Sequence, residues 1–113
     1  MAQSRAVSKY VRLSPRKARR VVDLVRGLEV NEALNVLQLL PHAGAKPVAK
    51  AIASAAANAE DAHGLSRDEL YVAEISADEG PRLKRWRAGA RGRFKPRLKR
   101  LSRIGVVVAE RES

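Results

Sequence analysis

The chain has 113 residues and carries 23 Lys and Arg against 12 Asp and Glu, which gives a net charge of +11. With no Cys and only two His, it offers no disulfide framework and no thiolate or all-histidine metal site. No stretch approaches the roughly 20 apolar residues of a membrane span, and residues 1–10 lack a signal-peptide apolar run, so we expect a soluble protein that is not exported. A chain of this length without repeats or a glycine-serine linker predicts a single domain, 1–113.

Residues 5–13 alternate loosely between apolar and polar positions, which predicts an edge strand. The alternation places Val7, Lys9, Val11 and Leu13 on one side of that strand. The first elements of the fold are therefore a strand and, directly after it, a helix.

This first helix is predicted to begin at Ser14-Pro15 and to stop at Gly27. A Ser hydroxyl can accept a hydrogen bond from a free backbone N–H, and Pro at the first helical position loses none. One apolar stripe follows at helical spacing and predicts the buried side. It consists of Ala18, Val21, Val22 and Val25, with Arg16, Arg20 and Asp23 on the opposite face.

Two more helices are predicted in the middle of the chain. The second runs from Glu29 or Asn31 to Leu40, where Pro41 ends it, and its inward residues are Ala33, Leu34, Leu37 and Leu40. The third starts between Ala45 and Pro47 and runs to Gly64. Its many alanines favour helix and let other elements approach its axis, so we expect it to be the central packing helix.

The C-terminal third predicts two strands. Residues 71–78 alternate with period two, with Tyr71, Ala73, Ile75 and Ala77 on one side. Residues 102–109 contain three consecutive valines. The segment between them, about 79–103, is read as a long hairpin arm. One limb of about eleven residues reaches about 35 Å at roughly 3.3 Å per residue, so the arm must project from the body.

The arm carries the whole net charge of the chain. Residues 82–103 contain eleven cations and no acid, while the other 12 basic residues are balanced by the 12 acidic ones. So dense a charge needs a polyanion to neutralise it, and the sparse apolar residues cannot form a core. Eight of the cations are Arg, whose planar fork grips phosphate and stacks on bases, which favours structured RNA. We therefore expect the arm to be disordered until it binds RNA.

Four separated blocks resemble the bacterial-type large-subunit ribosomal protein L twenty-two family. They are residues 10–19 (YVRLSPRKAR) leading to 22–27 (VDLVRG), 54–59 (SAAANA), 70–72 (LYV) with 78–81 (DEGP), and 90–93 (ARGR). The resemblance implies an α+β fold, with three helices packed on a small three-stranded antiparallel sheet and a long protruding basic β-hairpin. It also implies contact with large-subunit ribosomal RNA, a role early in subunit assembly, and a hairpin that lines the nascent-peptide exit tunnel.

The predicted RNA-binding residues fall into two groups, one around the start of the first helix and one on the arm. They are Lys9, Arg12, Ser14, Arg16, Lys17 and Arg20, and Arg82, Lys84, Arg85, Trp86, Arg87, Arg91, Gly92, Arg93, Lys95, Arg97, Lys99, Arg100 and Arg103. Arg16, Lys17 and Arg20 are equally well read as an ordinary polar helix face, with Arg20 paired to Asp23. Trp86 is equally well read as stacking on a base or as packing across the hairpin.

The implied partners are large-subunit ribosomal RNA, neighbouring large-subunit ribosomal proteins and the nascent peptide, without a membrane, a cofactor or a homo-oligomer. The implied location is the cytoplasmic ribosome, with an organellar ribosome as the alternative. A second class of function is an architectural DNA-binding protein with a basic β-arm, which would usually dimerise. An enzyme is disfavoured, because the sequence shows no metal cluster, no nucleophile with its base and no phosphate-binding glycine loop.

Overall fold

A computed structural model describes residues 3–11, 13–41, 44–88 and 94–110. The elements in chain order are β1 (Gln3–Val11), α1 (Pro15–Val25), α2 (Val30–Leu39), α3 (Ala45–His63), a short 3₁₀ helix (Arg67–Glu69), β2 (Leu70–Ala88) and β3 (Phe94–Glu110). The predicted α+β class with three helices is confirmed, and each helix lies within a few residues of its predicted bounds.

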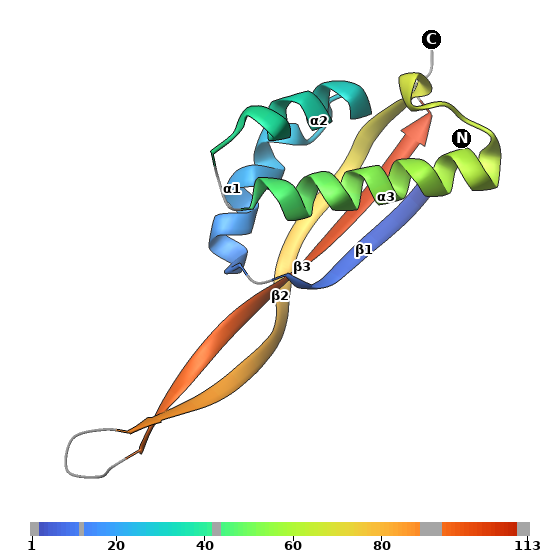
Figure 1. Cartoon of the computed structure of the whole chain (residues 1–113). Coiled ribbons are helices and arrows are strands. Elements are labelled where there is room, and N and C mark those ends of the chain that lie inside the picture. The colour runs from blue at the N-terminus through green and yellow to red at the C-terminus, as the bar shows by residue number, and fades with distance from the viewer. Residues whose placement is uncertain (1–2, 12, 42–43, 89–93, 111–113) are drawn as a thin grey trace.

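The three strands form one antiparallel sheet in the order β1-β3-β2. β1 is an edge strand, as predicted, and β3 lies in the centre. Figure 1 shows the three helices on one face of this sheet, with α3 crossing β1 and β3. The other face of the sheet carries exposed side chains, including Arg5, Glu74 and Arg103.

The core lies between the sheet and the helices. The stripe predicted for α1 is buried throughout, and the small residues of α3 let the helix lie close to the strands. Ile52 is fully buried near the middle of α3. Ser14 caps α1 as predicted, accepting from the Lys17 backbone N–H at 3.4 Å, and Gly27 has the positive φ of a residue that stops a helix.

Two β-bulges overturn the predicted faces of the outer strands. Val7 is 39% exposed whereas Val11 is 7% exposed, because the register shifts between Ser8 and Val11. In β2 the register shifts between Val72 and Glu74, so Val72 and Ile75 are both buried and Tyr71 is not. A bulge inserts one extra residue and so exchanges the two faces of a strand. The prediction was therefore wrong in placing Val7 on the same side of its strand as Val11, and Tyr71 on the same side as Ile75.

The hairpin of β2 and β3 extends far beyond the body (Figure 1). Backbone pairing continues from Arg82 opposite Arg100 to Ala88 opposite Phe94. The radius of gyration is 17.1 Å and the principal extents are 66 × 27 × 15 Å. A compact domain of this length has a radius of gyration of about 13 Å, so the long axis reflects the projecting arm.

Candidate nucleic-acid interface

The register of the hairpin places like charges opposite one another along the arm. Arg82 faces Arg100, Arg85 faces Arg97 and Arg87 faces Lys95. Like charges directly opposite in an antiparallel pair are destabilising, and no third strand or helix among the described residues packs on the ribbon. Bound phosphates would remove this repulsion. The backbone arrangement is therefore suited to an anionic partner.

The predicted site residues are described to different depths. Arg12, Arg91, Gly92 and Arg93 lie outside the described residues. For Lys9 and for the arm positions between 82 and 100, the structure describes the backbone pairing. The described side chains of the predicted set are Ser14, Arg16, Lys17, Arg20 and Arg103.

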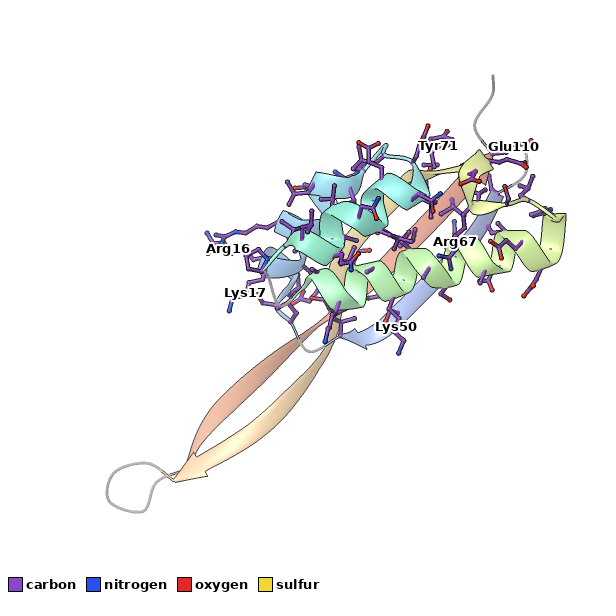
Figure 2. The ribbon with its side chains drawn as sticks, turned by 45° about the horizontal axis from the view of Figure 1, so that its top comes forward. Arg16, Lys17, Lys50, Arg67, Tyr71 and Glu110 are labelled. Atoms are coloured by element: carbon purple, nitrogen blue, oxygen red, sulfur yellow. The ribbon has the colours of Figure 1, made fainter. Side chains whose placement is uncertain are left out.

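The start of α1 forms a basic surface at the root of the arm. Arg16, Lys17 and Arg20 are exposed, and Figure 2 shows Arg16 and Lys17 at the end of the body from which the hairpin leaves. A hollow of about 360 Å³ on the outer sheet face is separate from this surface, while a hollow of about 320 Å³ lies beside it, lined by Ser14, Pro15, Arg16, Arg19 and Glu79. The alternative pairing of Arg20 with Asp23 is not seen, because Asp23 accepts from Arg26 Nη1 at 2.8 Å.

Arg103 lies in a different setting from the α1 cations. It is exposed on the outer face of the sheet and stands directly opposite Asp78 in the register. The hollow around it is also lined by Arg5 and Glu74. Opposite charges that face each other across strands favour strand pairing, and we expect a small contribution of this kind from Arg103 beside its predicted RNA contact.

Two arginines that were not predicted as functional, one on α1 and one directly after it, bind the free edge of β2. Arg19 Nε donates to the Ala77 carbonyl at 3.0 Å, and Arg26 Nη2 donates to the Ile75 carbonyl at 2.9 Å. Residues 19 and 26 are two helical turns apart, and alternate carbonyls of a strand point the same way, so the spacings match. This edge is thereby closed to further strand pairing. Because the contacts span 58 and 49 positions, no local sequence signal marks them.

A buried hydroxyl fixes the root of the arm on the other side. Ser102, which is fully buried, donates to the Leu13 carbonyl in the turn between β1 and α1. Leu13 in turn packs beside Gly44 at the start of α3. A Cβ added to Gly44 would lie 2.7 Å from the Leu13 Cδ2 atom. β3 is therefore tied to the body at the point where the arm begins.

Several acidic residues lie at the opposite end of the body, while Asp78 and Glu79 lie at the root of the arm. Glu69 precedes β2, Glu110 ends β3, and Asp68 accepts from the Asn31 side chain at 2.7 Å. Figure 2 shows Glu110, Tyr71 and Arg67 at the end away from the arm. The arm and the α1 cations thus lie at one end of the molecule, and Asp68, Glu69 and Glu110 lie at the end away from the arm. A polyanion is attracted to the arm end.

Within the part of the chain that the structure describes, no helix is both long and apolar enough to cross a membrane. Among the same residues, no three His, Cys, Asp or Glu side chains gather closely enough to hold a metal ion.

Fold and surface together define a class: a small α+β protein with a projecting basic hairpin. Residues 6–109 match the family model of ribosomal protein L22p/L17e. The chain is 50% identical over 110 residues to the large ribosomal subunit protein uL22 of Thermoanaerobacter pseudethanolicus, covering 97% of this chain and 99% of that protein. It is 49% identical over 112 residues to the protein of that name in Desulfitobacterium hafniense, covering 99% and 98%. The chain therefore belongs to the ribosomal protein L22p/L17e family.

Proposed function

We propose that this protein is a structural, non-catalytic constituent of the large ribosomal subunit that binds large-subunit ribosomal RNA through its arm. The observation that carries the proposal is the concentration of the net charge of +11 on residues 82–103, paired so that cations face cations. The same proposal treats residues 1–113 as one domain whose arm spans about 79–103.

The arm and α1 have different parts in this function. The arm cations, together with Trp86 and Gly92, enter the RNA and line the nascent-peptide exit tunnel. Ser14, Arg16, Lys17 and Arg20, with Lys9 and Arg12 on the preceding segment, contact RNA at the arm's root. Exposure of Arg16, Lys17 and Arg20 on one helix end supports the second part.

The concentration of the net charge on the arm also supports the remaining parts of the proposal. With the arm end held in RNA, the protein stabilises an early stage of subunit assembly and faces neighbouring ribosomal proteins and the nascent peptide. It acts in the cytoplasmic ribosome, without a membrane or a second copy of itself.

Competition between ribosomal RNA and duplex DNA tests the proposal. Labelled bacterial large-subunit ribosomal RNA is bound by the protein at several salt concentrations and challenged with unlabelled duplex DNA of equal phosphate content. We expect the RNA complex to survive, and the protein to co-sediment with large subunits in high salt. Equal competition by DNA, with no co-sedimentation, would instead support an architectural DNA-binding protein.

A further inference from the structure

The two outer edges of the sheet are covered to different extents. Along β2, the Gly27 and Leu28 backbones pair with Val72, at 3.0 and 2.8 Å, and Arg26 and Arg19 cover the next carbonyls. Along β1, two side chains of α3 approach the edge carbonyls. Asn58 Nδ2 donates to the Arg5 carbonyl at 3.1 Å, and a His63 ring nitrogen lies 3.2 Å from the Gln3 carbonyl.

Beyond Arg5 the edge of β1 opens into a groove. The carbonyls of residues 3 and 5 point away from β3. Because a strand repeats every two residues, the N–H and C=O of Val7 also point away from β3. Among the described side chains, none is hydrogen-bonded to Val7 there. The groove lies between β1 and α3 and has a volume of about 180 Å³. Its lining residues are Ala6, Val7, Ser8, Lys50, Ala51 and Ser54.

The charge around this groove is positive. Its charge comes from Lys50 at the rim; Lys46, one turn earlier in α3, lines a different hollow, against α2. No acid lines the groove, and residues 45–59 of α3 contain none; the acids of this helix, Glu60 and Asp61, lie in its last turn. In Figure 2 the arm leaves the body between Lys17 on one side and Lys50 on the other.

We infer that this groove, with Lys50 at its rim, is a second binding site for the phosphate backbone of the RNA. It lies on the far side of the arm's root from α1. The inference rests on the proposed function and extends it to a surface outside the predicted residues. The outward Val7 N–H and the hydroxyls of Ser8 and Ser54 are donors for phosphate oxygens. Lys acts on phosphate as a compact point charge, and the small side chains let a backbone approach closely.

An added β-strand from a protein partner fits this edge less well. Such a strand would need several consecutive outward positions of β1 to pair with. Two of them are already occupied, since Asn58 and His63 cover the carbonyls of Arg5 and Gln3. The short open stretch at Val7 is long enough for one or two phosphates.

Charge reversal at the groove tests the inference, with a matched reversal at the other end of the body. Lys50→Glu is compared with Arg67→Glu, whose residue is exposed near the acidic end. Binding of the full chain to bacterial large-subunit ribosomal RNA is measured from 50 to 200 mM salt. Each phosphate contact contributes about 0.9 to the slope of log affinity against log salt, or about threefold in affinity over this range. We expect the slope of log affinity against log salt to be shallower by at least about 0.9 for Lys50→Glu than for the wild type, and to be unchanged for Arg67→Glu.

A neutral pair separates the groove from general charge. Ser54→Gln narrows the groove, whereas Ala57→Gln adds the same side chain at an exposed position of α3 outside it. We expect the first to weaken RNA binding several-fold and the second to leave it unchanged, with the thermal unfolding of both as the check on folding.

Each outcome decides the inference. If Lys50→Glu and Arg67→Glu bind RNA with the same affinity and salt dependence while the wild-type chain still prefers ribosomal RNA, the groove is not an RNA-binding site. The proposed function then stands. If Lys50→Glu binds RNA normally but fails to enter subunits, the groove contacts a protein instead, which also overturns the inference. If the wild-type chain does not prefer ribosomal RNA to duplex DNA, the proposed function falls and the inference falls with it.

Discussion

β3 passes through two environments, the packed body and the projecting arm. The contrast shows which part of the strand is supported by a hydrophobic core and which part is not. Its C-terminal half lies between β1 and β2 under α3, and buries Ile104, Val106 and Val108. Its N-terminal half pairs with β2 alone, and there Arg97 faces Arg85 and Arg100 faces Arg82. An isolated two-stranded ribbon is marginal in water even without such repulsion. One continuous strand is thus packed in the body, while we expect its extension in the arm to depend on a partner for its order.

The largest expected effect comes from removing the arm. Replacing Lys84–Leu98 with Asn-Gly joins Leu83 to Lys99, which are register partners, through a two-residue turn suited to a hairpin. Seven of the eleven arm cations are lost. Interfaces with 6–10 phosphate contacts lose about 10³–10⁵ in affinity between 50 and 200 mM salt, and we expect this dependence for the wild type.

For the arm deletion, we expect a much flatter plot of log affinity against log salt and a body that unfolds cooperatively near the wild-type temperature. An unchanged slope would show that the arm is not the main RNA-binding element. Loss of cooperative unfolding would show that the body needs the arm, contrary to the contrast drawn within β3.

A matched pair of truncations on β3 sharpens the contrast. Ile104→Ala empties a fully buried position and should cost about 2–5 kcal/mol in the free energy of unfolding. Leu98→Ala lies on the arm, and we expect it to leave that free energy unchanged. Urea denaturation of the two variants measures both values. A similar loss for Leu98→Ala would mean that the arm is packed in the free protein.

Removing three α1 cations tests whether the body also anchors RNA. Arg16, Lys17 and Arg20 are exposed, and the buried stripe of the helix is untouched when all three become Ala. If each contacts one phosphate, the salt slope falls by about 2.7, at about 0.9 per contact. We expect weaker entry into large subunits without loss of helix content. Normal assembly of the triple variant would show that these residues form an ordinary solvated helix face and do not anchor RNA.

The helices were predicted more completely than the sheet. Ser14, Pro15, Gly27 and Gly64 are signals that act within one turn of the chain, and the helix stripes depend on local spacing alone. The bulges near Ser8 and Ala73 arise from pairing between distant strands, so simple alternation misplaced Val7 and Tyr71. The same limit applies to function. Charge density drew attention to the arm, but no local signal marked the contact of Arg19 with the Ala77 carbonyl, which lies 58 positions away in the chain.

The tie at the arm's root gives a smaller, local prediction. Ser102→Ala leaves the Leu13 carbonyl without its buried donor, which should cost about 1–3 kcal/mol in unfolding free energy. Ser76→Ala, on the exposed outer face of the same sheet, is the control and should cost little. Equal stability of the two variants, measured by thermal unfolding, would remove Ser102 as an anchor of the arm.

Amide hydrogen exchange on the free protein and on its complex with ribosomal RNA tests the central claim most directly. In the free protein we expect amides of residues 82–88 and 94–100 to exchange rapidly, and amides of 104–108 and of α3 around Ala51 to Ala59 to be protected. A backbone ordering cost of about 1–2 kcal/mol per residue is not offset where cations face cations. RNA should then protect the arm. Strong protection throughout the arm without RNA would show that the hairpin is self-supporting and would contradict the account.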